Sequence, residues 1–138
     1  MNVTINFLAV GLAALSSMIV GTIYYLPALF GNRLTALTGV DPNKPKRPAL
    51  TYVLSFIASA ITAYVLAYMT WLTWASFDEQ PLLPAFITGF SLWLGFTAAR
   101  MLIHDLFDGR DIRIFFITIG HELITILVMA AIIGLLGA

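Results

Sequence analysis

The stretch IFFITIGHELITILVMAAIIGLLG, from Ile114 to Gly137, decides the class of fold. Its only ionisable residues are His121 and Glu122, and the remaining positions are apolar, small or threonine. About 20 such residues cross the hydrocarbon core, because a helix rises about 1.5 Å per residue through about 30 Å. The stretch is predicted to be a transmembrane helix, since a lone strand would leave its backbone groups unpaired in lipid.

Three further apolar stretches are long enough to span a bilayer, so the chain has four: about 3–26, 49–74, 82–107 and 114–137. Of the 138 residues, 60% are apolar and only 10% are charged, with a mean hydropathy of +0.94. A soluble domain carries about 25% charged residues. Short links make consecutive helices neighbours that run in opposite directions. The sequence therefore predicts an all-α polytopic membrane protein, one domain of residues 1–138 folded as an antiparallel four-transmembrane-helix bundle.

The basic residues outside the spans predict how the chain sits in the cell membrane. They fall in the first connection (Arg33, Lys44, Lys46, Arg47) and the third (Arg110, Arg113). Because Lys and Arg are retained in the cytoplasm, both connections are predicted to be cytoplasmic, with both termini and the Asp78–Glu79 link outside. Lys44, Lys46 and Arg47 either give only this topology signal or also contact anionic headgroups. The early part of the first connection, Leu29–Leu37, is predicted to form a short interfacial helix.

Composition and motifs exclude several classes of function. The formal net charge is zero, so no partnership with nucleic acid is expected. There is no cysteine, which excludes disulfides and thiolate metal sites. The sequence has no phosphate-binding glycine loop, HExxH motif or nucleophile elbow, so we expect no enzyme activity and no cofactor. His104 and His121 lie at different depths without a third ligand at metal-like spacing, so no metal site is expected.

The ionisable residues within the spans are the most informative, because a mid-helix Arg or Asp costs about 2.5–3.5 kcal/mol on insertion. They all fall on the third and fourth spans: Arg100, His104, Asp105, His121 and Glu122. Arg100 and His104 are four residues apart and share a helix face. Both spans meet in a turn near Arg110, which places Arg100 level with Glu122. The sequence predicts an Arg100–Glu122 ion pair flanked by His104 and His121.

This polar cluster has several interpretations. It either only locks two helices together, binds an anionic headgroup or carboxylate through Arg100, or relays protons through His104, His121 and Glu122. Tyr64 and Tyr68 share a face of the second span, where they either pack or line the same cavity. The corresponding functions are a small transporter or channel-like protein that handles an anion, a proton or a lipid-like molecule, or a structural or regulatory membrane subunit.

Small residues at a spacing of four bear on assembly in the bilayer. They recur as Ala9, Ala13, Ser17 and Gly21, as Ser55, Ser59, Ala63 and Ala67, and as Ala130 and Gly134. Such residues let helix backbones approach closely where no hydrophobic effect drives association. Four helices offer more of these faces than one chain needs, so a homo-oligomer is expected.

The end of the first span carries a resemblance to a known family. Residues 21–31 read GTIYYLPALFG, with Gly21, Tyr24, Tyr25, Pro27, Phe30 and Gly31 at the motif positions. The segment resembles the G-x-x-[WY]-Y-x-P-x-[LV]-F-G signature of a small bacterial and fungal membrane family, domain of unknown function 1761. Leu94-Gly95-Phe96 and Gly120-His121 add weaker matches, and Tyr24 stands where that family often has Trp. The resemblance implies a four-helix integral membrane protein and brings no activity.

Overall fold

The computed structural model describes residues 3–76 and 80–137, and all regular structure in these ranges is helical. The elements are α1 (Phe7–Tyr24), η1 (Pro27–Gly31), α2 (Asn32–Thr38), α3 (Pro48–Trp74), α4 (Leu82–Leu92), η2 (Trp93–Ala98), α5 (Ala99–Phe107) and α6 (Ile112–Leu136). Four helical spans among them, with α4, η2 and α5 forming one, are long and apolar enough to cross a membrane. The predicted all-α class is confirmed, while the Asp78–Glu79 link lies outside the described residues.

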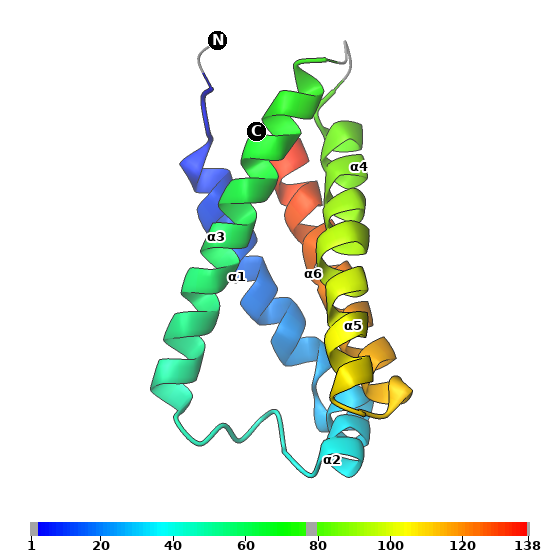
Figure 1. The fold of residues 1–138 in the computed structure, drawn as a ribbon. Helices are drawn as coiled ribbons and strands as arrows, with labels where there is room; N and C mark the ends of the chain where they lie inside the picture. Colours follow the sequence, from blue (N-terminus) through cyan, green and yellow to red (C-terminus); the bar gives the residue numbers. More distant parts are fainter. Residues whose placement is uncertain (1–2, 77–79, 138) are drawn as a thin grey trace.

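Figure 1 shows how the four spans are placed. The start of α1 and the end of α6 lie at one end of the molecule, and α2 and the turn between α5 and α6 lie at the other. The first end is tied by Asn6, whose side-chain amide donates to the carbonyl oxygen of Leu136 at 3.1 Å. The same side chain caps α1 by accepting from the amide of Ala9, which satisfies an N–H that the first turn leaves free. The orientation of the two ends across a membrane stays a prediction.

The core lies toward the end of the molecule that carries both termini. Small side chains from α1, α3, α4 and α6 are fully buried there: Ala9, Ala13, Ala63, Ala85 and Ala130. A Cβ added at Gly134 would lie 2.7 Å from the Cα of Leu82, so α4 and α6 are in backbone contact at this point. Most of the small residues seen in the sequence therefore pack within the chain. These buried residues are not available for contacts between chains, so they no longer support the expected homo-oligomer, which stays a prediction.

The α3 helix is packed over only part of its length. Ala63, Leu66, Ala67 and Thr70 are buried, whereas every residue from Pro48 to Ala58 is exposed. These residues are exposed because the first half of α3 diverges from α1 and α6 toward the α2 end (Figure 1). The four helices are thus closed around a core at one end and open at the other.

Candidate functional site

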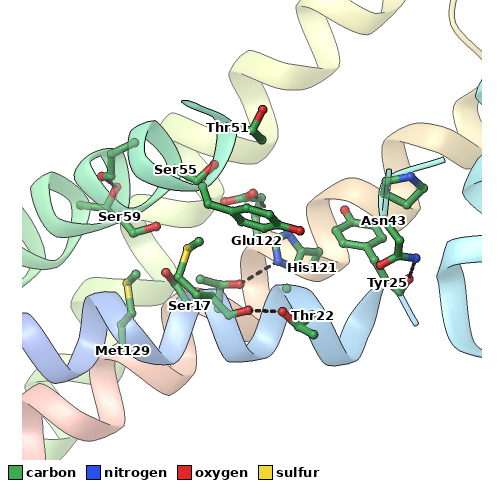
Figure 2. Close-up of a pocket in the computed structure, with 17 residues that line it drawn as sticks. Ser17, Thr22, Tyr25, Asn43, Thr51, Ser55, Ser59, His121, Glu122 and Met129 are labelled. Carbon is green, nitrogen blue, oxygen red and sulfur yellow. Dashed lines mark hydrogen bonds and ion pairs between the residues drawn. The ribbon is translucent and has the colours of Figure 1, made fainter. Parts of the chain in front are cut away.

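The open end holds a cavity of about 440 Å³ between α1, α3 and α6. Its lining comes from α1 and the residue after it (Ser17, Met18, Gly21, Thr22, Tyr25), the first connection (Pro42, Asn43), α3 (Thr51, Tyr52, Ser55, Ala58, Ser59, Thr62) and α6 (His121, Glu122, Thr125, Met129). Figure 2 shows labelled side chains of the three helices arranged around this space. We call it the α1–α3–α6 crevice. Within it, the exposed half of α3 meets the charged side chain of α6.

His121 is held on the α1 side of the crevice. Its ring lies 4.9 Å from the ring of Tyr25 and 5.3 Å from that of Tyr24, measured between centroids. A Cβ added at Gly21 would lie 3.4 Å from Nε2 of His121, so the missing side chain leaves room for the imidazole. Nε2 also lies 3.3 Å from the hydroxyl of Thr125, one turn further along α6. These contacts fix the ring in one orientation.

Tyr24 explains why the family motif at the end of α1 and Gly120-His121 on α6 belong together. Its hydroxyl donates to the carbonyl oxygen of Ile117 at 2.7 Å, and its ring stacks on Phe30 at 4.5 Å. A Cβ at Gly120 would approach the Tyr24 hydroxyl to 2.9 Å. Glycine at position 120 is therefore what lets the tyrosine reach the backbone of α6.

The wide turn η1 brings Phe30 back onto Tyr24. Pro27 begins the turn, where its missing N–H costs nothing, and the amide of Gly31 donates to the carbonyl oxygen of Leu26 at 3.1 Å. A Cβ at Gly31 would clash with the carbonyl oxygen of Tyr25, so only glycine fits. The side-chain amide of Asn43 then donates to that same oxygen at 2.8 Å, which ties the first connection to the mouth of the crevice.

Glu122 is the charged group of the crevice. It follows Ile112 by ten residues, or about 15 Å of helix, which is near the middle of the span. Its carboxylate lies 3.4 Å from Nδ1 of His121, and 42% of its side chain is exposed. In the described ranges, no Lys or Arg lines the crevice and His121 is the only ion partner of Glu122.

Three hydroxyl groups of the crevice are placed to accept hydrogen bonds from a ligand. Ser17, Thr22 and Thr62 each donate to a carbonyl oxygen three or four residues earlier in their own helix. A hydroxyl that has used its proton in this way keeps lone pairs for a ligand. The crevice thus combines one carboxylate with several acceptor oxygens, which favours ligands that carry positive charge or N–H groups.

The predicted Arg100–Glu122 ion pair is wrong. Arg100 and His104 do share a face, but it is the exposed face of α5, while Ala98 and Asp105 lie on the buried one. Equal depth in a helical hairpin does not decide which way a side chain faces. The π-helical turn η2 adds about one residue to the turn before Arg100, which rotates the rest of the span by about 100°.

Other predicted residues also lie away from the crevice. Tyr64 and Tyr68 are exposed on α3, and Tyr64 packs on Phe7 with 6.3 Å between ring centroids, so packing is the interpretation that holds for it. Asp105 is buried beside the turn, where Arg110 lies 3.6 Å from one carboxylate oxygen and the other has no hydrogen-bond partner among the described residues. In the same turn, Arg113 pairs with Asp111 at 2.7 Å.

The sequence analysis missed the hydroxyl groups of the crevice. Thr51, Ser55 and Ser59 recur at a spacing of four and continue to Thr62, which is one face of α3. Ser55 and Ser59 were interpreted as small packing residues instead. The recurrence of hydroxyl side chains at successive turns is the signal that favours a crevice lining over a packing face, because packing alone requires only small side chains.

The fold indicates a membrane protein with an open, partly polar crevice between three of its four apolar spans. Its sequence matches the family described as a protein of unknown function (DUF1761) over residues 8–134, and the chain belongs to that family. Searches of curated proteins and of solved structures found no match. The family resemblance seen in residues 21–31 is confirmed, and the structure adds that this segment packs against Gly120 and His121.

Proposed function

We propose that this protein is a small membrane carrier that binds either a proton or a cation at Glu122, within the α1–α3–α6 crevice. The observation that carries the proposal is a carboxylate near mid-span that faces a cavity and has only His121 as an ion partner among the described residues. An ionised carboxylate away from water is costly unless it is paired. The proposal is therefore that this carboxylate is neutralised by its ligand, either a proton or a cation.

The ligand of the proposed site is positively charged, whereas the sequence also allowed a site for an anion. Anion binding was expected because Arg100 was placed beside Glu122, and the exposed position of Arg100 removes that cation from the crevice. The titratable groups that line the crevice are Tyr25, Tyr52, His121 and Glu122. Two are phenols and one is an imidazole next to the carboxylate, so His121 is suited to pass a proton to or from Glu122.

The test measures binding and proton release together. The purified protein in lipid nanodiscs is mixed with tetraphenylphosphonium in weakly buffered solution, and bound probe and released protons are counted. We expect saturable binding that weakens as the pH falls, with proton release on binding. Glu122→Gln should abolish both, because the amide neither ionises nor attracts a cation. Asp108→Asn is the matched control, since Asp108 is exposed and does not line the crevice.

A folded Glu122→Gln protein that binds the probe as the wild type does would overturn the proposal. Because this lipophilic cation also crosses bilayers unaided, only uptake that is driven by a proton gradient and exceeds uptake into liposomes with Glu122→Gln would identify a transporter rather than a binding protein. A second candidate, a structural or regulatory subunit, is favoured by the two side chains that clamp α6 around Gly120. Tyr24 bonds the carbonyl oxygen of Ile117, and the indole of Trp93 donates to that of Ile119 at 3.0 Å. That candidate predicts that Glu122→Gln changes stability and nothing else.

A further inference from the structure

We infer that the ligand of the crevice is a single-chain amphiphile with a cationic headgroup, seated with its charge at Glu122 and its chain toward Met129. This inference rests on the proposed function, because it assumes that Glu122 attracts a cation. It adds the class of ligand, its orientation and the phase from which it comes. The flexible apolar side chains that line the crevice beyond Glu122 and the packing of α3 carry it.

The crevice offers apolar groups beyond Glu122, among hydroxyl groups that are mostly engaged: those of Ser17 and Thr62 donate to carbonyl oxygens of their own helices, and that of Thr125 lies against His121. Asn43 and Thr51 lie at the mouth, near the α2 end, and Glu122 lies near the middle of α6. Met129 comes seven residues later, or about 10 Å further toward the core. Met18 on α1 also lines the crevice. Flexible thioether side chains adapt to apolar chains of varied shape, so a ligand that fits both parts carries a charge at one end and an apolar group at the other.

The far end of the crevice is closed. Beyond it, Ala13, Ala63 and Ala67 are fully or almost fully buried in the core. A ligand therefore neither passes straight through toward the end that carries the termini nor leaves by that route in this structure. Its apolar end stops against the small-residue core.

The side of the crevice opens to the surroundings of the helices. Every residue of α3 from Pro48 to Ala58 is exposed, including Thr51 and Ser55 on the crevice wall and Ile57 away from it. In a bilayer, these exposed positions face lipid on either side of α3. A soluble cation would meet Glu122 only through the mouth, whereas an amphiphile dissolved in the bilayer reaches it laterally between α1 and α3.

The absence of cysteine from the chain makes a clean labelling experiment available. Ser59→Cys places one thiol on the crevice wall, and Ile57→Cys places one on an exposed part of the same helix outside it. Each variant is labelled with N-ethylmaleimide in nanodiscs, with and without dodecyltrimethylammonium. We expect at least about tenfold slower labelling of Ser59→Cys in the presence of the amphiphile and no change for Ile57→Cys. The protection should disappear when Glu122→Gln is added.

Two probes separate the parts of the inference. Dodecanoate has the same apolar length with a negative charge, and equal protection by it would overturn the inference. Tetramethylammonium has the charge without the chain, and we expect protection only at a much higher concentration, since each buried methylene strengthens binding by up to about fourfold. Equal protection by tetramethylammonium would contradict the inference that the ligand is an amphiphile, but it would remain consistent with the cation site of the proposed function.

If dodecyltrimethylammonium does not slow the labelling of Ser59→Cys, the inference is wrong. The tetraphenylphosphonium measurement then tests the cation site independently. Should Ser59→Cys fail to fold, Ser55→Cys with Phe56→Cys as control gives the same test. Ser55 lines the crevice, whereas Phe56 is exposed on the same helix and does not.

Discussion

The two halves of α3 differ in what holds them. The half that contains Ala63, Leu66 and Ala67 is buried against α1, α4 and α6, where small side chains let the backbones approach closely. The half from Pro48 to Ala58 is exposed throughout and forms one wall of the crevice. One helix thus combines a packed half, which stabilises the fold, with an exposed half, which lines the crevice.

The largest effect on stability is expected from a larger side chain in the buried half of α3. Ala63→Leu adds a large side chain where none of the residue is exposed, and we expect it to lower the free energy of unfolding by about 1–3 kcal/mol. Ala49→Leu makes the same change at an exposed position of the open half and should have almost no effect. Thermal unfolding in detergent, followed by circular dichroism, measures both. Equal destabilisation by the two variants would show that the open half is packed in the membrane.

The contact between α1 and α6 beside the crevice is tested at Gly120 and Tyr24. Gly120→Ala should destabilise by about 1 kcal/mol, because its Cβ would meet the Tyr24 hydroxyl at 2.9 Å and this outweighs the better helix propensity of alanine. Tyr24→Phe should cost about 0.5–1.5 kcal/mol through the lost hydrogen bond to Ile117. In the Tyr24→Phe background, Gly120→Ala should become neutral or stabilising, since the oxygen atom that it meets is gone. A double-mutant cycle measures this coupling, and strict additivity would contradict the contact.

A smaller effect on stability is expected in the open half. Thr62→Val removes a hydroxyl from the crevice wall at an exposed position, so the free energy of unfolding should stay within about 0.5 kcal/mol of the wild type. The affinity for tetraphenylphosphonium should nevertheless fall, because an acceptor oxygen of the crevice lining is lost. Ala60→Ser, on the same helix outside the crevice lining, is the control. An unchanged affinity for Thr62→Val would show that this hydroxyl does not contribute to cation binding.

The smallest effect concerns the turn that leads into α6. Arg113 pairs with Asp111 and lowers the pKa of that carboxyl from 3.8 to about 2. A depressed pKa stabilises the fold above the ordinary value of 3.8, and the contribution is lost as the pH falls from there toward about 2. Asp111→Asn keeps a capping side chain and removes the charge, so it should lower the Tm slightly at neutral pH and not at all at the acidic limit. Because the pair is solvent-exposed, added salt should also remove the difference; a difference that persists in acid would argue against the ion pair as its cause.

The spans were predictable from the sequence because hydrophobic length alone decides them. The stretch from Ile114 to Gly137 has only two ionisable residues, and α6 runs from Ile112 to Leu136. The depth of Glu122 followed from the same counting. Hydropathy fixes position along the membrane normal, and the structure agrees with the sequence in that one dimension.

The direction in which side chains face was not predictable in the same way. Arg100 was expected to face Glu122, whereas it is exposed on α5, just after the π-helical turn η2. A local change in helical pitch of this kind alters the direction of later side chains and leaves hydropathy unaltered. The crevice was missed for a related reason. Ser55 and Ser59 are both small and polar, and only the divergence of α3 from α1 shows that their hydroxyls have a cavity to face.

Because the first half of α3 diverges from its neighbours, a tilt of the helix about its packed half would move its first residues the most. Ala63 is fully buried in the core, and Pro48 lies about 22 Å away at the rise of an α-helix. A tilt of about 10° about Ala63 would displace Pro48 by about 4 Å over such a length. A small adjustment among the packed alanines would therefore produce a larger displacement at the entrance, where Asn43 holds the first connection against Tyr25.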